Sequence, residues 1–190
     1  MLEARAAADC IKQDGTRASQ VLQRIRSLLA GGQPNRAKVQ LSETIHEAVS
    51  LIEPEARAQS VTVKAAIAPN LRPVLADRIQ LQQVILNLSL NAIEAMKSIA
   101  DRPRLLEIGA EHEGDDKVRV LVRDSGPGLS AANRDRAFDA FYTTKAQGMG
   151  MGLAICRSIV DAHGGTLWSS ANHDWGETFQ FTFPTQAIAP

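Results

Sequence analysis

The sequence predicts a protein of mixed α and β structure, in which one α/β domain follows an N-terminal helix. Segments with apolar residues at helical spacing alternate with shorter segments in which apolar and polar residues alternate, and this succession is typical of α/β and α+β proteins. The 190 residues suit one domain with a short appendage, and 44% hydrophobic residues suffice for a sizeable core. Paired glycines followed by a proline predict a linker near residues 31–37.

Composition and charge exclude several classes of protein. The 21 basic and 21 acidic residues give a net charge of +0, so the chain lacks the basic field that gathers nucleic acid or anionic membranes. The two cysteines, Cys10 and Cys156, are isolated in apolar surroundings, which predicts free, space-filling thiols and gives a zinc site little support. No apolar signal core or stretch of about 20 apolar residues occurs, so we expect a cytoplasmic chain without membrane contact of its own, even if a longer parent is membrane-anchored.

Residues 1–34 are expected to form a separate helical segment with its linker. Apolar residues recur at spacings of three and four from Ala18 to Leu29, which predicts one helix over residues 1–30. Residues 35–190 then make up the main domain.

The elements of the main domain follow from the same periodicities and from the turn residues that interrupt them. Helices are predicted over residues 42–58, 77–99, 133–140 and 151–163. Strands are predicted over residues 38–41, 61–67, 74–75, 105–111, 117–123, 166–170 and 178–183. Residues 124–152 contain five of the 13 glycines, and such a segment between an apolar strand and an apolar helix indicates a ligand-handling loop.

Two asparagines on the longest predicted helix are candidate metal ligands. Asn87 and Asn91 are four residues apart, so they lie on one face of the helix, one turn from each other. An amide oxygen can complete the octahedral shell of a Mg²⁺ ion whose other ligands are phosphate oxygens and water. The alternative interpretation is a solvated polar stripe, although the neighbouring Leu88 and Leu90 favour partial burial.

A carboxylate and two glycines follow directly on the strand predicted over residues 117–123. Asp124 can accept a hydrogen bond from an exocyclic amine, and Gly126 and Gly128 leave room for a flat ring to lie against the backbone. A tight turn without a ligand explains the same residues equally well.

Residues 138–153 combine aromatic residues with a second glycine-rich turn that opens a helix. The N–H groups at a helix N-terminus bind anionic oxygens because the helix dipole is positive there, which indicates a phosphate site at Gly148, Met149, Gly150, Met151, Gly152 and Leu153. Lys145 either adds a point charge to this site or is a solvated surface lysine. The group of Phe138, Phe141 and Tyr142 is expected to be core or a hydrophobic hinge of the loop.

These motifs, in this order, resemble the ATP-binding catalytic domain of bacterial sensor histidine kinases, within the superfamily that also holds gyrase B, Hsp90 and MutL. The matching boxes are the N box at residues 87–92, the G1 box at 124–128, the F box at 138–141 and the G2 box at 148–153. Residues 162–165 and 176–179 extend the match, which covers residues 38–184. The residues of the F and G2 boxes are similar to those of the subgroup that includes the oxygen-sensing FixL-type kinases.

The resemblance implies a Bergerat-type two-layer α/β sandwich, with a mixed, mostly antiparallel sheet and helices on one face. It implies ATP and Mg²⁺ as cofactors, with Asp124 accepting from the adenine amino group, Asn91 binding Mg²⁺, Asn87 near the triphosphate and residues 129–150 as the ATP lid. The implied nucleotide-binding set is Asn87, Asn91, Asp124, Gly126, Gly128, Tyr142, Lys145, Gly148, Met149, Gly150, Met151, Gly152, Leu153 and Thr178. Glu94 stands where many relatives carry a basic residue, which favours Lys145 as the phosphate contact.

One departure from the family concerns the phosphorylated histidine. The four histidines, His46, His112, His163 and His173, are each expected to be structural, and none lies in an H box. The helix at residues 1–30 resembles the second helix of the dimerisation hairpin that carries this box. We therefore expect nucleotide binding without autophosphorylation, a histidine-bearing segment of the parent kinase and a response regulator as partners, and a homodimeric parent.

Two other functions use the same fold. An anti-sigma-type serine kinase needs no H box, but the hairpin-like first helix and the F box argue against it. A non-enzymatic interaction module needs no nucleotide, but Asn91, Asp124 and the five loop glycines argue against that interpretation.

Overall fold

The computed structural model describes residues 35–144 and 150–185. The predicted N-terminal helix lies outside the described residues, so the domain boundary after residue 34 stays a prediction. Lys145, Gly148 and Met149 also lie outside them. The described elements are β1 (Ala37–Val39), α2 (Leu41–Ala58), β2 (Val61–Ile67), β3 (Val74–Ala76), α3 (Arg78–Met96), β4 (Arg104–Glu113), β5 (Lys117–Asp124), α4 (Ala131–Arg136), α5 (Gly152–Ala162), β6 (Thr166–Ala171) and β7 (Glu177–Pro184).

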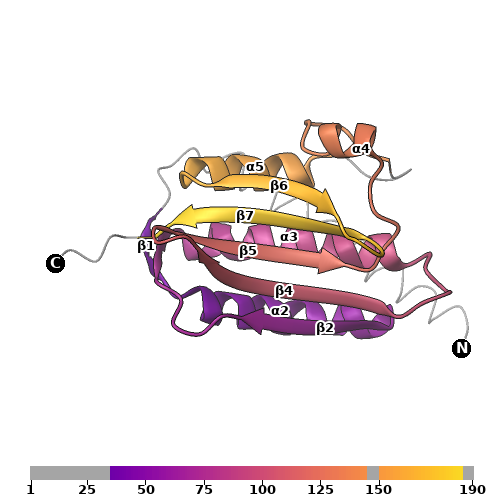
Figure 1. The fold of residues 1–190 in the computed structure, drawn as a ribbon, viewed down its shortest axis with the longest axis horizontal. Coiled ribbons are helices and arrows are strands. Elements are labelled where there is room, and N and C mark those ends of the chain that lie inside the picture. The colour runs from indigo at the N-terminus through magenta and orange to yellow at the C-terminus, as the bar shows by residue number, and fades with distance from the viewer. Residues whose placement is uncertain (1–34, 145–149, 186–190) are drawn as a thin grey trace, which may run out of the picture. The chain divides into compact units, whose positions relative to one another are not determined.

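The main sheet has five strands in the order β2-β4-β5-β7-β6 (Figure 1). β2 and β4 are parallel, and the other three pairs are antiparallel. β1 and β3, predicted as strands over residues 38–41 and 74–75, form a separate two-stranded antiparallel sheet, a pairing that was not predicted. The mixed, mostly antiparallel sheet implied by the sequence is confirmed.

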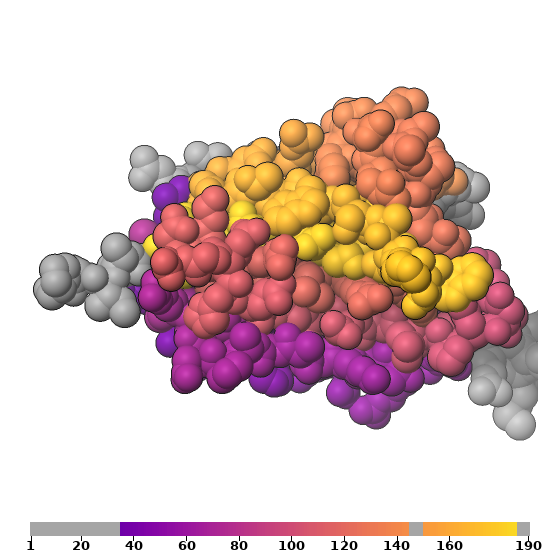
Figure 2. All heavy atoms as spheres, viewed as in Figure 1, coloured from indigo at the N-terminus to yellow at the C-terminus, as the bar shows by residue number. Residues whose placement is uncertain are grey.

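One face of the sheet carries the helices. α2 packs on β2 and β4, α3 packs on β4 and β5, and α5 packs on β6 and β7 (Figure 1). The strands alternate accordingly: on β5, Val118, Val120 and Val122 are buried in the core between the layers. Figure 2 views the opposite face, where the side chains of the strands themselves form the surface. The predicted two-layer sandwich is therefore confirmed. No helix in the described part of the chain is long and apolar enough to cross a membrane.

The ends of α3 are set by two side chains. Asp77 caps its start, because its Oδ1 accepts from the N–H groups of Ile79 and Gln80 at 3.0 and 3.2 Å. At the other end the guanidinium of Arg104 donates to the carbonyls of Lys97 and Ile99. Because these carbonyls accept hydrogen bonds from Arg104, they do not need an N–H group of a further helical turn. The helix ends at Met96 and not at residue 99 as predicted.

His163 joins the end of α5 to the start of α3. Its Nδ1 donates to the carbonyl of Ile159 at 2.7 Å, and its Nε2 accepts from the N–H of Asp77 at 3.0 Å. The ring is buried and also packs edge-on against Phe183. The prediction of a structural histidine is confirmed at this position.

Replacing Leu88 with alanine should lower the free energy of unfolding by about 2–5 kcal/mol, because it empties a fully buried position on α3. Leu90, two residues along the same helix and 37% exposed, is the matched control, and its replacement should cost less than about 1 kcal/mol. Urea unfolding followed by circular dichroism measures both values. Equal losses in the two variants would contradict the packing of α3.

Candidate functional site

Asp124 is a buried carboxylate at the end of β5. Its side chain is 5% exposed, and its Oδ1 accepts from the N–H groups of Gly126 at 2.8 Å and Glu177 at 3.4 Å. Burial raises the pKa of Asp124 to about 6, against the two backbone N–H donors that lower it, and the charge of Glu177 raises it further. The carboxylate is therefore ionised at neutral pH, and its charge lies in a poorly solvated place.

The backbone approaches Asp124 so closely that glycine is required beside it. A Cβ at Gly176 would lie 1.9 Å from the carbonyl oxygen of Asp124, and Gly176 has a φ of +87°. The same carbonyl accepts from Asn172 Nδ2 at 2.8 Å. These contacts fix the β6–β7 connection against the end of β5.

The predicted nucleotide contact Thr178 supports this connection from the helix-free side of the sheet. Its hydroxyl donates to Asn172 Oδ1 at 2.5 Å, and its register opposite Arg123 places it away from the core that Phe179 enters. The structure thus brings Glu177, rather than Thr178, to the carboxylate of Asp124. The sequence signal for Glu177 is its place in β7, where it alternates with the buried Phe179 and Phe181, so that a charged residue points inward.

Gly126 and Gly128 allow two close approaches after β5. A Cβ at Gly126 would lie 2.7 Å from Asp124 Oδ1 and within 3.7 Å of side-chain atoms of Met96 and Ala95 on α3. Gly128 has a φ of +73°, and a Cβ there would lie 3.1 Å from the carbonyl oxygen of Gly176. Both predicted glycines therefore belong to the immediate surroundings of Asp124.

Arg102 holds the same turn from outside, and sequence analysis did not single it out. It donates to the carbonyls of Ser125 and Gly126 at 3.1 and 3.0 Å, and its guanidinium stacks on the ring of Trp175 at 4.2 Å. Arg102 therefore ties the turn after β5 to the connection between β6 and β7.

Asn87 and Asn91 lie on the side of α3 that packs against α5. The amide nitrogen of Asn91 lies 3.8 Å from the place of a Cβ at Gly152, the first residue of α5. The thiol of Cys156, in the interior of α5, donates to the carbonyl of Val84 on α3 at 4.0 Å, and the nearby Asn87 side chain lowers its pKa. Burial raises the pKa of that thiol to about 12, so Cys156 is the inert, space-filling cysteine that the sequence predicts.

The glycine-rich turn before α5 closes on the end of the aromatic segment. Gly150 has a φ of +64°, and a Cβ there would lie 2.5 Å from the carbonyl oxygen of Tyr142. The N–H of Phe141 donates to the carbonyl of Gly150 at 3.0 Å. Met151, the N-cap of α5, contributes no side-chain hydrogen bond to the first turn, whose N–H groups begin at Gly152 beside Asn91.

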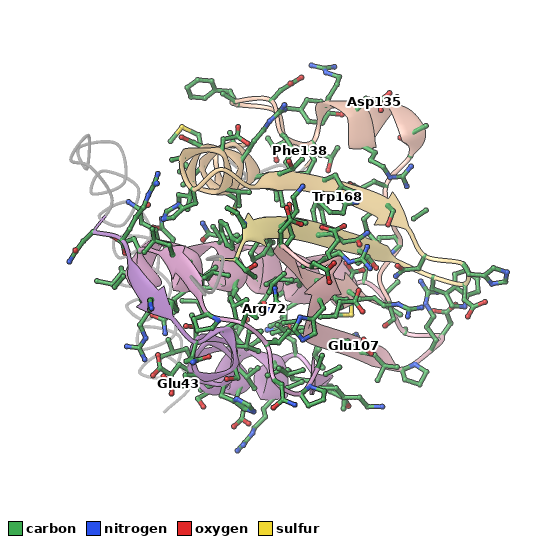
Figure 3. The ribbon with its side chains drawn as sticks, turned by 60° about the vertical axis from the view of Figure 1, so that its left-hand side comes forward. Glu43, Arg72, Glu107, Asp135, Phe138 and Trp168 are labelled. Atoms are coloured by element: carbon green, nitrogen blue, oxygen red, sulfur yellow. The ribbon has the colours of Figure 1, made fainter. Side chains whose placement is uncertain are left out.

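The three aromatic residues at positions 138–142 have different roles. Phe138 packs edge-on against Phe179 with ring centroids 6.2 Å apart, and Tyr142 donates to Asn133 Oδ1 at 2.7 Å, where Arg136 covers its ring. Phe141 is 75% exposed with a φ of +66°, so it is not part of the core, and its role as a hinge of the loop stays a prediction. Figure 3 shows Asp135 on α4 and Phe138 where the chain returns toward α5 and β6, the strand that carries Trp168.

A two-layer sandwich with a buried acid at a strand end, and an asparagine facing a glycine-opened helix, defines a nucleotide-binding ATPase domain. Residues 76–187, more than half of the chain, match the family described as histidine kinase-, DNA gyrase B-, and HSP90-like ATPases, and the chain belongs to this family. It is a catalytic domain of the histidine kinase type.

Curated relatives of the chain are sensor proteins. The chain is 40% identical over 179 residues to the sensor protein FixL of Bradyrhizobium diazoefficiens, a match that covers 94% of this chain and 35% of FixL. It is 38% identical over 183 residues to the C4-dicarboxylate transport sensor protein DctS of Rhodobacter capsulatus, covering 95% of this chain and 27% of DctS. The chain thus spans about a third of the length of the curated relatives it matches.

Solved structures of histidine kinases share the fold. The nucleotide-free catalytic domain of ThkA is 34% identical with a TM-score of 0.71, covering 80% of this chain and 96% of that one. Full-length ShkA in complex with AMPPNP is 25% identical with a TM-score of 0.79, covering 98% of this chain and 40% of ShkA. ThkA in complex with the response regulator protein TrrA is 28% identical with a TM-score of 0.71, covering 90% of this chain and 49% of that one.

Replacing Asp124 with asparagine should raise the free energy of unfolding at pH 7.5 by up to about 3 kcal/mol, because it removes a buried charge whose pKa is about 6 instead of 3.8. The folded state binds the Asp124 proton more tightly than the unfolded state does, so the gain should shrink as the pH falls through 6 and vanish below about 4. Urea unfolding at several pH values measures it. The exposed Asp115 is the control, and a gain of equal size for Asp115→Asn would refute the explanation.

Proposed function

We propose that this domain binds ATP together with Mg²⁺ and supplies the γ-phosphate to a histidine on another segment of its parent sensor kinase. The observation that carries the proposal is Asp124, an ionisable carboxylate buried at a strand end among glycines. A buried charge that costs stability and is not needed for packing is characteristic of a binding site. The AMPPNP complex of the similar kinase ShkA supports an adenine nucleotide as the ligand.

Asp124 can recognise adenine through its exocyclic amine. The backbone N–H groups of Gly126 and Glu177 both donate to Oδ1, which holds the carboxylate plane in one orientation. An amino group on a flat ring lying against Gly126 would donate to this carboxylate, whereas a carbonyl at the same ring position would be repelled. The site is thus suited to adenine and not to hypoxanthine.

The phosphates belong at the start of α5. A Cβ added at Gly152 would have one described atom outside its own helix within 4 Å, the amide nitrogen of Asn91 at 3.8 Å. The first turn of α5 is therefore open at this position. The N–H groups of the first turn of α5 carry the positive end of the helix dipole, which favours anionic oxygens.

The same place fits a magnesium ion that arrives with the nucleotide. Asn91 offers a neutral amide oxygen, the donor that suits Mg²⁺ when phosphate and water supply the remaining ligands. The ion would neutralise phosphate charge there. Asn87 lies one turn away from Asn91, near Cys156 of α5, and is therefore close to the proposed phosphate site.

The contribution of the protein to phosphoryl transfer is positioning and charge compensation. None of the four histidines of the chain lies in an H box. His163 is also buried with both ring nitrogens bonded, and His46 is bonded to the carbonyl of Ser42 within its own helix. We therefore place the acceptor on another segment, and the exposed Phe141 of the lid offers an apolar contact for it.

Sensor kinases such as FixL and DctS support the histidine kinase role over that of an anti-sigma-type serine kinase. The ThkA complex with TrrA supports a response regulator as partner. We place the domain in the cytoplasm, in a homodimeric parent. The alternative is an interaction module that binds no nucleotide. ATP binding in a titration would exclude it.

Calorimetric titration should show ATP binding that strengthens with Mg²⁺. Asp124→Asn should lose affinity by at least about tenfold, since the amide presents a donor to the adenine amino group, while Asn91→Ala should lose mainly the Mg²⁺ dependence. Inosine triphosphate, with a carbonyl in place of the amine, should bind wild type weakly. Affinity for ATP should fall as the pH drops through about 6, where Asp124 becomes protonated. Equal affinity for the two nucleotides would exclude the assigned role of Asp124.

Incubation with radiolabelled ATP should leave the domain itself unlabelled and should label an added histidine-bearing hairpin from the parent kinase. The label should be lost in acid and survive in base, because phosphohistidine is acid-labile and phosphoserine is not. An acid-stable label on a protein serine would instead identify the anti-sigma-type activity.

A further inference from the structure

The first helix of the lid is held by polar contacts. α4 is six residues long and has no buried residue, so apolar packing of the helix does not fix its position. In Figure 1 it lies outside the helical layer, near the end of β6. Leu129 before the helix and Phe138 after it pack against the core, and Ala137 is buried. α4 between them needs another attachment to the sandwich.

Glu177 provides that attachment. Its Oε1 accepts from Arg134 Nε at 2.6 Å, and its Oε2 accepts from Arg134 Nη2 and from the N–H of Leu129, both at 3.1 Å. Arg134 Nη2 also donates to the carbonyl of Leu129 at 2.9 Å. Both oxygens of Glu177 thus accept hydrogen bonds from groups of the lid, so this carboxylate holds the lid.

Glu177 also contacts Asp124, the acid proposed to recognise adenine, through its backbone. The backbone N–H of Glu177 donates to Asp124 Oδ1 at 3.4 Å. Glu177 is buried, so its charge acts on Asp124 through a medium of low polarity, and it adds to the effect of burial in raising the pKa of Asp124. The forked pair with Arg134 supplies the opposite charge that keeps two buried carboxylates compatible.

We propose that Arg134 and Glu177 are positioning residues that couple the lid to Asp124: the ion pair holds the start of the lid on β7 and cancels the second negative charge beside the adenine site. The inference rests on the proposed function, since it assigns a role at the same site. Arg134 and Glu177 act through Leu129 and Asp124, to which they are hydrogen-bonded.

The other charged groups described near Asp124 do not compensate the charge of Glu177, so this role falls to Arg134. Arg102, from the connection between α3 and β4, has its guanidinium committed to the carbonyls of Ser125 and Gly126 and to Asp101. α3 presents Ala95 and Met96 at this point, which carry no charge. Arg123 precedes Asp124 on β5 but points to the opposite face of the sheet, where it is exposed.

ATP titrations from pH 5 to pH 8 on wild type, Arg134→Gln, Glu177→Gln and the double variant test the coupling. Arg134→Gln leaves the charge of Glu177 uncompensated, so the pH at which affinity is half lost should rise by about one unit. Glu177→Gln removes that charge, so the midpoint should fall, and the double variant should follow Glu177→Gln. Both single variants should also bind ATP about tenfold more weakly at pH 8, because the lid has lost its anchor. An ion pair with a purely structural role would weaken binding without opposite midpoint shifts.

Arg123→Gln is the matched control, because it removes the same charge next to Asp124 in sequence without touching Glu177, and its midpoint should stay at the wild-type value. Two measurements need no nucleotide: the carboxyl ¹³C titration of Asp124, which should show the same opposite shifts, and the amide exchange of Leu129, which should accelerate at least tenfold in Arg134→Gln. Shifts in one direction, or none, together with unchanged exchange at Leu129, would overturn the proposal. If wild type binds no ATP, the proposed function fails, while these two measurements still decide the coupling.

Discussion

The burial of one negative charge at the end of β5 is the constraint on which the rest of the site depends. Asp124 keeps its carboxylate in a place where ionisation is costly, and two backbone N–H groups reduce that cost without neutralising it. Its surroundings are shaped by this requirement, since Gly126 and Gly176 bring backbone within reach where any side chain would intrude. A second acid, Glu177, is tolerated next to it because its charge is paired with Arg134.

The layered architecture holds the proposed adenine and phosphate ends of the site differently. Asp124 extends from the central strand of the sheet, whose core side is filled by Val118, Val120 and Val122, so its position is as fixed as the core. The proposed phosphate end lies between two helices, α3 and α5, which are linked by the contact of Cys156 with Val84 and, at the far end, by His163. The lid joins these parts at its two ends, through Leu129 and through Gly150.

The sequence predicted what depends on local periodicity and missed what depends on tertiary contacts. The alternation in β5 and the spacing in α3 placed both elements and the residues Asn91 and Asp124, because burial on one face leaves a repeating pattern. The end of α3 was predicted three residues late, because the group that ends it, Arg104, comes from β4. Glu177 was not singled out because the family motif gives the box but not the strand face, which the pairing of β7 with β5 decides. The exposure of Phe141 follows from its left-handed backbone, which no spacing reveals.

The lack of any buried residue in α4 also determines how the lid responds to temperature. Exposure of apolar surface is the main source of the heat-capacity change when a protein opens, and detaching α4 alone exposes almost none. The equilibrium between attached and detached α4 should therefore change nearly linearly in free energy with temperature, whereas the stability of the sandwich beneath it follows a curve with a maximum. A change of temperature should therefore shift the attachment of α4 and the stability of the core in different ways. The attachment equilibrium of α4 should remain separate from unfolding throughout the temperature range in which the core is stable.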